Sequence, residues 1–198
     1  MRWRRRLYRR WWLETMTALK RALFLDRDGV INVDIGYLHR AEDCVFVPGI
    51  FELVRQARKA GFDVFVVTNQ AGIARGYYSE ETFAAFTGWM LEQFAAEGAP
   101  ITQVYYCPHH PTAGVGGYGI VCECRKPAPG MLLRAAGEHH VDLGASVMVG
   151  DSLTDMQAAK AAKVGTSYLF GDAVVEDLDS GVVRVNDLLD VAARIAGI

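Results

Sequence analysis

Short apolar runs alternate with amphipathic segments along most of this chain, from residue 22 onward. The runs at 22–25, 62–67, 101–106, 146–149 and 166–170 are typical of buried strands, and 182–185 is a candidate for a sixth. Helices are predicted between them, over 49–60, 79–98, about 129–140, 153–163 and from about 187 onward. This regular alternation predicts an α/β domain with a mostly parallel central sheet.

The stretch between the third strand and the next helix breaks this alternation. It is rich in Pro, Gly, Cys and His, and an irregular loop of this length is unusual in a compact domain unless something orders it. Cys107 with a nearby histidine, and Cys122 with Cys124, offer four ligands for tetrahedral zinc. Spacing alone leaves open whether His109 or His110 is the ligand. The alternative is a loop of reduced cysteines and histidines without a metal.

Charge is uneven along the chain, although the net charge is only −2. Residues 1–21 carry eight basic side chains and one acidic one, a net charge of +7, which leaves −9 for the remainder. Such a mildly acidic body does not favour nucleic-acid binding. Trp3, Leu7 and Trp11 recur at helical spacing among the arginines, which would suit a helix on an anionic membrane surface. We expect instead a disordered extension over 1–18, followed by one domain over 19–198.

Targeting signals are missing from the pattern. No run of eighteen apolar residues predicts a transmembrane segment, and the basic N-terminus lacks the apolar stretch of a signal peptide. Three of the four cysteines cluster beside histidines, whereas a disulfide framework would be denser and more evenly spread. We therefore predict a cytoplasmic protein, and we expect a monomer.

Polar motifs stand directly after three of the predicted strands. They are Asp26-Arg27-Asp28, Thr68-Asn69-Gln70 and Gly150-Asp151-x-x-x-Asp155, with Arg125-Lys126 ahead of the fourth strand. In parallel sheets ligands bind at the carboxyl ends of strands, so we expect these residues to share one site. A few hard oxygen ligands, with room for water and phosphate, are what Mg²⁺ prefers. The cation would relieve repulsion between the aspartates and let an anionic nucleophile approach a phosphate.

In order and position, these motifs resemble those of the haloacid dehalogenase (HAD) superfamily of phosphotransferases, from the first strand to the fifth. The resemblance implies a single Rossmann-like doubly wound domain. It implies that Asp26 is the nucleophile, forming an aspartyl-phosphate, and that Asp28 is the general acid and base. Thr68 and Lys126 would bind the transferring phosphoryl group. Mg²⁺ would be held by Asp26, the backbone carbonyl of Asp28 and Asp151.

The cysteine-containing segment, which we call the zinc loop (residues 107–127), resembles one branch of that superfamily. This branch contains the D-glycero-D-manno-heptose 1,7-bisphosphate phosphatases and the histidinol-phosphate phosphatases, and its members lack a large cap domain. The resemblance implies that the first histidine is the ligand, which gives a structural zinc site of Cys107, His109, Cys122 and Cys124. It also implies a substrate site lined by Asp34, Gly36, Tyr37, Asn69, Gln70 and Arg125.

The implied activity is a phosphatase for a small phosphorylated substrate. The expected reaction removes the 7-phosphate of heptose 1,7-bisphosphate during nucleotide-activated heptose synthesis, and the anomer is left open. The alternative is a histidinol-phosphate phosphatase or another small-molecule phosphomonoesterase. Ser152 stands where the bisphosphatases have a lysine, and Ala71 where they have a serine. A third hypothesis, from another class, is a zinc-stabilised binding module whose catalytic residues are vestigial.

Overall fold

A computed structural model describes residues 19–172 and 181–197 of the chain. The hypotheses about 1–18 concern a segment outside the described residues and stay open. The strands are β1 (Arg21–Leu25), β2 (Phe62–Asn69), β3 (Gln103–Cys107), β4 (Val147–Gly150), β5 (Thr166–Phe170) and β6 (Val182–Val185). The helices are α2 (Ile50–Lys59), α3 (Ala71–Ala74), α4 (Glu80–Ala96), α5 (Gly130–His139), α6 (Leu153–Ala161) and α7 (Leu188–Ala196).

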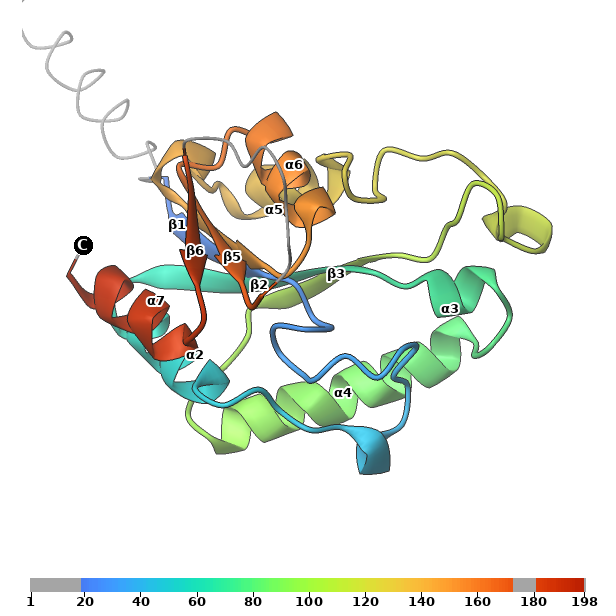
Figure 1. The fold of residues 1–198 in the computed structure, drawn as a ribbon, viewed down its shortest axis with the longest axis horizontal. Coiled ribbons are helices and arrows are strands. Elements are labelled where there is room, and N and C mark those ends of the chain that lie inside the picture. Colours follow the sequence, from blue (N-terminus) through green and yellow to red (C-terminus); the bar gives the residue numbers. More distant parts are fainter. Residues whose placement is uncertain (1–18, 173–180, 198) are drawn as a thin grey trace, which may run out of the picture.

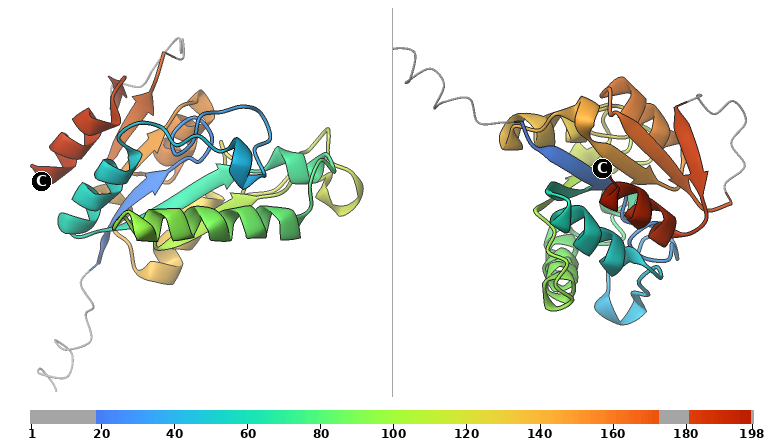
Figure 2. Two further views of the ribbon diagram at one scale, coloured as in Figure 1. Left: turned by 90° about the horizontal axis from the view of Figure 1, so that it is seen from below. Right: turned by 90° about the vertical axis from the view of Figure 1, so that its left-hand side faces the viewer.

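The six strands form one sheet in the order β3-β2-β1-β4-β5-β6, and every neighbouring pair is parallel. Helices α2, α4 and α7 cover one face, and α5 and α6 cover the other (Figures 1 and 2). The chain runs outward from β1 to β3, returns to β4 beside β1, and then runs outward the other way. The prediction of a doubly wound α/β domain is therefore confirmed, and within the described residues no second domain is present.

Two apolar cores lie on either side of the sheet because side chains alternate along each strand. Leu23 and Leu25 of β1 face the core shared with α2, α4 and α7, whereas Ala22 and Phe24 face α5 and α6. A strand buried on both faces needs apolar residues at nearly every position. That requirement explains why the strands are continuous apolar runs in the sequence.

The predicted helices are present, with small differences at their ends. Ser79 caps α4, accepting a hydrogen bond from the Thr82 N–H at 3.2 Å, as the sequence predicts. Pro129 precedes α5 as its N-cap, whereas the sequence places it at the first helical position. The single turn α3 is not predicted at all, because four residues are too few to show a helical period. None of the described helices is long and apolar enough to cross a membrane.

The switch in strand order lies between β1 and β4. Leu25 pairs with Val66 of β2 on one side and Val149 of β4 on the other. The chain segments that leave these three strands therefore emerge side by side at one edge of the sheet. In open α/β sheets this is where ligands bind.

Candidate active site and metal centres

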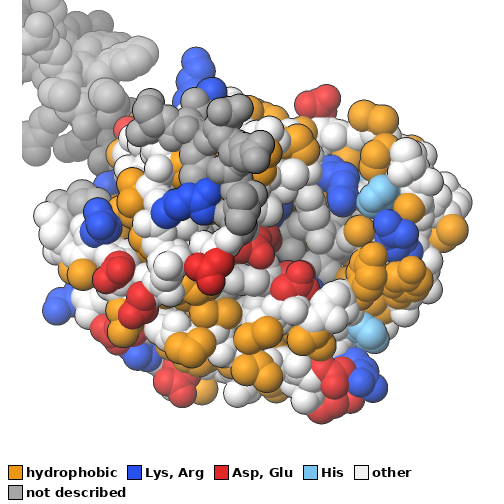
Figure 3. All heavy atoms as spheres, in the orientation of Figure 1, with side chains coloured by type: hydrophobic (Ala, Val, Ile, Leu, Met, Phe, Trp, Pro, Cys, Tyr) orange, Lys and Arg blue, Asp and Glu red, His pale blue; other side chains and the backbone are white. Residues whose placement is uncertain are grey.

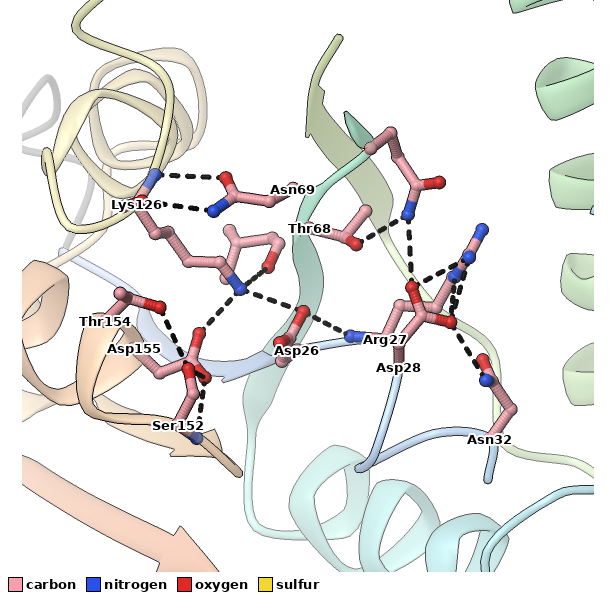
Figure 4. A network of polar contacts seen from close by, with 12 residues as sticks. Asp26, Arg27, Asp28, Asn32, Thr68, Asn69, Lys126, Ser152, Thr154 and Asp155 are labelled. Atoms are coloured by element: carbon pink, nitrogen blue, oxygen red, sulfur yellow. Dashed lines mark hydrogen bonds and ion pairs between the residues drawn. The ribbon is translucent and has the colours of Figure 1, made fainter. Parts of the chain in front are cut away.

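Asp26 follows β1 and lies at the centre of this edge (Figure 4). Its Oδ1 accepts a hydrogen bond from the Arg27 N–H at 2.7 Å and lies 2.8 Å from Lys126 Nζ. Lys126 is only 4% exposed, and its Nζ also donates to the Val67 carbonyl at 2.8 Å and lies 2.6 Å from Asp155 Oδ1. Burial opposes the charged ammonium, but Asp26 and Asp155 outweigh that effect and raise the pKa of Lys126.

Three carboxylates gather around this single lysine. Oxygens of Asp26, Asp151 and Asp155 lie within 4.8 Å of one another. Burial and then the charge of Asp155 raise the pKa of Asp26 to about 8, although Lys126 acts in the opposite direction. Burial and Asp155 likewise raise the pKa of Asp151 to about 6. This excess of negative charge, carried on hard oxygen donors, fits a divalent cation such as Mg²⁺.

Asp155 orients the group and has little capacity left as a ligand. Its Oδ2 accepts hydrogen bonds from the Ser152 N–H at 3.1 Å and the Ser152 hydroxyl at 2.5 Å, while Oδ1 faces Lys126. The same contacts cap the start of α6. The Ser152 side chain is therefore directed at Asp155. Asp26 and Asp151 remain as the carboxylates best placed to bind a cation.

Gly29 lets Asp151 come close to the backbone after Asp28. A Cβ at Gly29 would lie 1.9 Å from Asp151 Oδ2, and the residue has φ +85°, a conformation that favours glycine. The peptide next to Asp28 therefore lies against the Asp151 carboxylate. This arrangement suits the predicted ligand set of Asp26, Asp151 and the Asp28 carbonyl.

Arg27 holds the Asp28 carboxylate in place. Its Nη2 donates to both carboxylate oxygens at 2.9 and 2.8 Å, and its Nε donates to Oδ1 at 3.1 Å. Arg27 is only 1% exposed, donates to the Leu38 carbonyl, and lies over the rings of Phe83 and Phe86. An arginine inside the domain thus fixes the direction of a carboxylate at its edge.

A chain of two hydrogen bonds links Tyr78 to Thr68 through Gln70. The Tyr78 hydroxyl donates to Gln70 Oε1 at 2.6 Å, and Gln70 Nε2 donates to Thr68 Oγ1 at 2.8 Å. Gln70 Nε2 also lies 3.4 Å from Asp28 Oδ2. Because Thr68 accepts from Gln70, its own O–H can donate to a ligand.

Asn69 pairs both the nitrogen and the oxygen of its amide with the backbone of Lys126. Its Nδ2 donates to the Lys126 carbonyl at 3.1 Å, and its Oδ1 accepts from the Lys126 N–H at 3.0 Å. The following Lys126–Pro127 peptide is cis. Asn69 therefore positions the lysine, and its predicted substrate contact stays a prediction.

The remaining predicted substrate residues are exposed or half-buried. Asp34 is exposed and accepts a hydrogen bond from the Gly36 N–H at 2.8 Å. The Tyr37 ring packs edge-on against Tyr77, with ring centroids 4.8 Å apart. Arg125 is half-buried, and its Nη1 donates to the His109 carbonyl at 3.1 Å.

The zinc loop brings four soft ligands together. Cys107, His109, Cys122 and Cys124 form one group, and all three cysteines are free thiols. The sulfur–sulfur distances are 3.5, 3.1 and 3.2 Å, and His109 Nδ1 lies 3.8 Å from Cys107 Sγ and 3.4 Å from Cys124 Sγ. Tetrahedral ligands at ~2.3 Å from zinc would lie roughly 3.8 Å apart. The donor set fits that metal, while four of the five distances are shorter than this separation.

His110 points elsewhere. Its Nδ1 accepts hydrogen bonds from the N–H groups of Thr112 at 3.3 Å and Ala113 at 3.1 Å. Of the two histidines that spacing alone left open, the structure groups His109 with the cysteines. Sequence reasoning also gave no role to Arg27 or Tyr78. The only signal for Arg27 was its place between two aspartates, and Tyr78 offered none.

Comparisons with known proteins agree with this geometry. Residues 123–170 match the family model described as HAD-hydrolase-like. D-glycero-alpha-D-manno-heptose-1,7-bisphosphate 7-phosphatase of Burkholderia mallei is 55% identical over 83% of this chain and 88% of its own. D-glycero-beta-D-manno-heptose-1,7-bisphosphate 7-phosphatase of Escherichia coli K12 is 51% identical over 88% and 93%. The structure of D,D-heptose 1,7-bisphosphate phosphatase from B. bronchiseptica, complexed with magnesium and phosphate, is 32% identical with a TM-score of 0.76, covering 89% of this chain and 98% of that one.

Proposed function

This chain belongs to the heptose 1,7-bisphosphate 7-phosphatase family of HAD-like hydrolases, and from that membership we propose that it hydrolyses the 7-phosphate of D-glycero-D-manno-heptose 1,7-bisphosphate. The observation that carries the proposal is the buried Asp26 carboxylate beside Lys126, at the strand-order switch of a chain 55% identical to a phosphatase of that name. The product, heptose 1-phosphate, would enter nucleotide-activated heptose synthesis.

In this proposal Asp26 attacks the 7-phosphoryl group. One carboxylate oxygen, Oδ1, is held by the Arg27 N–H and Lys126, so the other can form the bond to phosphorus. The bond between phosphorus and the sugar oxygen breaks, and the phosphoryl group remains on Asp26. Lys126 exchanges its contact with Asp26 for a phosphoryl oxygen, and Thr68 donates its hydroxyl to another. Positioning and charge stabilisation are most of what phosphoryl transfer requires.

Asp28 moves the proton in both halves of the reaction. It protonates the departing sugar oxygen and then accepts a proton from the water that attacks phosphorus. Water attack releases phosphate and restores the Asp26 carboxylate. Arg27 holds the Asp28 carboxylate in one orientation through its hydrogen bonds, which suits both proton transfers.

We propose Mg²⁺ and zinc as the two resident metals. Mg²⁺ would be held by Asp26, Asp151 and the Asp28 carbonyl, and when bound it supplies positive charge that offsets phosphate and carboxylates. The donor set is the support for this assignment, with the Mg²⁺ complex of the B. bronchiseptica relative. Zinc would be structural, on Cys107, His109, Cys122 and Cys124. Elemental analysis finding no zinc in protein purified without chelators would contradict that assignment.

The deciding experiment measures phosphate release, with Mg²⁺ present, from both anomers of heptose 1,7-bisphosphate and from histidinol phosphate. We expect a clear preference for one heptose anomer. Equal or higher kcat/KM on histidinol phosphate would contradict the substrate. Asp26→Asn should abolish turnover while the protein stays folded by circular dichroism. A wild-type protein inactive on every phosphate ester would instead favour the binding module.

The working form that we propose is a cytoplasmic monomer. The free thiols of the zinc loop support a reducing compartment, because an oxidising one favours disulfides. Light scattering of the zinc-loaded protein would check the mass against 21.8 kDa for one chain.

A further inference from the structure

Gln70 is a buried side chain whose amide is engaged at both ends. It follows β2 and is only 1% exposed. Its Nε2 donates to Thr68 Oγ1 at 2.8 Å and lies 3.4 Å from Asp28 Oδ2. Its Oε1 accepts a hydrogen bond from the Tyr78 hydroxyl at 2.6 Å. The family resemblance implies a substrate contact for Gln70, whereas these contacts all join it to other side chains of the protein.

The orientation of this amide decides the direction of the Thr68 hydrogen bond. An amide has a donor end and an acceptor end, whereas a hydroxyl can both donate and accept. With Nε2 toward Thr68, the hydroxyl oxygen accepts, and its own proton is free to point at a phosphoryl oxygen. With the amide turned over, Oε1 would take that proton and leave only lone pairs for the phosphoryl group. One of the two orientations therefore supports the reaction.

Thr68 is the point where this chain of contacts reaches the reacting group. Asp26 lies between Lys126 and Thr68 in Figure 4, so a phosphoryl group on Asp26 would meet the lysine on one side and the hydroxyl on the other. Lys126 can only donate, because an ammonium has no acceptor. The Thr68 hydroxyl, in contrast, donates outward only when Gln70 presents Nε2 to it.

Tyr78 favours this orientation because it brings a donor to Oε1. Burial is the main cause that raises the pKa of Tyr78 to about 12, so its hydroxyl keeps the proton at neutral pH. Turning the amide over would leave this proton without its acceptor and would place Oε1 near the Asp28 carboxylate. Both changes are unfavourable, since a buried polar group without a partner costs free energy.

The Tyr78 ring is itself held in place. The His39 ring stacks on it, with ring centroids 4.7 Å apart and 16° between the planes. Gly72 of α3 lies so close that a Cβ there would overlap the same ring. The preceding residue, Tyr77, is exposed and packs against Tyr37, and Figure 3 shows hydrophobic side chains gathered over α3 on this face. Contacts from α3 and from segment 37–39 therefore hold the Tyr78 hydroxyl at Gln70.

We propose that Tyr78 is a positioning residue that acts through Gln70: its hydroxyl holds the amide so that Thr68 donates its proton to the transferring phosphoryl group. This inference rests on the proposed function, in which Thr68 binds that group. It gives Gln70 a role different from the substrate contact that the resemblance implies. Neither Tyr78 nor Gln70 would touch the substrate.

The test is a double-mutant cycle on phosphate release from heptose 1,7-bisphosphate, with zinc-loaded protein and Mg²⁺. Tyr78→Phe should lower kcat about 5- to 10-fold, the effect of one neutral hydrogen bond, and change KM less than about twofold. Thr68→Val should lower kcat about 10²-fold or more. The double variant should be no slower than Thr68→Val, because Tyr78 then has no hydroxyl to direct.

A matched control and a second cycle locate the path. Tyr105 is another buried tyrosine, and its hydroxyl donates to Glu138 on α5, so Tyr105→Phe should leave kcat unchanged. Gln70→Met keeps a similar volume and removes the amide. It should slow turnover at least as much as Tyr78→Phe, and adding Tyr78→Phe to it should change kcat less than about twofold. Circular dichroism checks that each variant is folded.

Three results would overturn the inference: no change of kcat in Tyr78→Phe, a change confined to KM, or the same loss of kcat when Tyr78→Phe is added to Thr68→Val. If the wild type turns over another phosphate ester but not the heptose bisphosphate, the cycle is run on that ester, because Thr68 would contact any transferring phosphoryl group. Wild-type protein inactive on every phosphate ester would refute the proposed function itself, which separates that failure from failure of the positioning role.

Discussion

Replacing Lys126 by methionine tests the electrostatic design of the site. Methionine keeps most of the volume and removes the charge, so packing changes little. Three contacts disappear, to Asp26, Asp155 and the Val67 carbonyl, each between 2.6 and 2.8 Å. Breaking a buried ion pair by removing one partner costs about 3–5 kcal/mol. We expect a loss of that size in unfolding free energy when the metal has been chelated.

With saturating Mg²⁺ the loss should be smaller, because the added cation offsets part of the carboxylate charge. Urea unfolding of both proteins, in chelator and in Mg²⁺, measures the two differences, and Lys59→Met on the exposed end of α2 is the control. Turnover should fall about 10²- to 10³-fold, as for removal of one donor to a developing charge. Equal destabilisation of Lys126→Met with and without Mg²⁺ would show that packing, and not charge, sets the cost, and would refute the reasoning.

Three further predictions concern the metals and pH. Gly29→Ala should weaken activation by Mg²⁺ at least about tenfold, because its Cβ would displace the Asp151 carboxylate. The control is Gly61→Ala, which has a similar φ of +83° but open space around it and should leave Mg²⁺ activation unchanged. In chelator, the raised pKa of Asp26 means that the folded protein retains a proton that the unfolded chain releases between about pH 4 and 8. Stability should therefore fall as pH rises through that window, and a melting temperature in Asp26→Asn that declines just as steeply would count against this cause. Removing zinc should speed amide exchange in the zinc loop before Mg²⁺ activation changes, and simultaneous loss of both would argue against separate sites.

Much of this fold could be predicted from the sequence because its signals are local. A strand buried on both faces is an apolar run, and its carboxyl end lies at a known edge of the sheet, so Asp26, Thr68 and Asp151 could be placed together. The cysteine spacing likewise predicted that Cys107, Cys122 and Cys124 would group together. Helix α3 could not be predicted because its four residues are too few to show the helical period of apolar positions.

Contacts made through packing could not be predicted. Arg27 reads in the sequence as a polar residue in a loop, yet it is fully enclosed between Asp28 and the aromatic rings of α4. Tyr78 acts on Thr68 through Gln70, and the direction of each hydrogen bond depends on how three segments meet. Such roles depend on how distant segments pack together, and no periodicity or residue spacing in a single sequence indicates that packing.

Asn69 behaves as a substitute peptide group. An amide offers a donor and an acceptor in the fixed geometry that the Lys126 backbone requires. The Asn69 side chain therefore forms the pair of hydrogen bonds with Lys126 that a neighbouring strand would otherwise form with its backbone. These hydrogen bonds fix the Lys126 backbone, and with it the buried ammonium, relative to β2, the strand that also carries Thr68. Asp, which lacks the donor, and Ser, which is too short, could not reproduce the pair. Variation at this position is therefore constrained by the geometry of the sheet, whichever sugar the enzyme accepts.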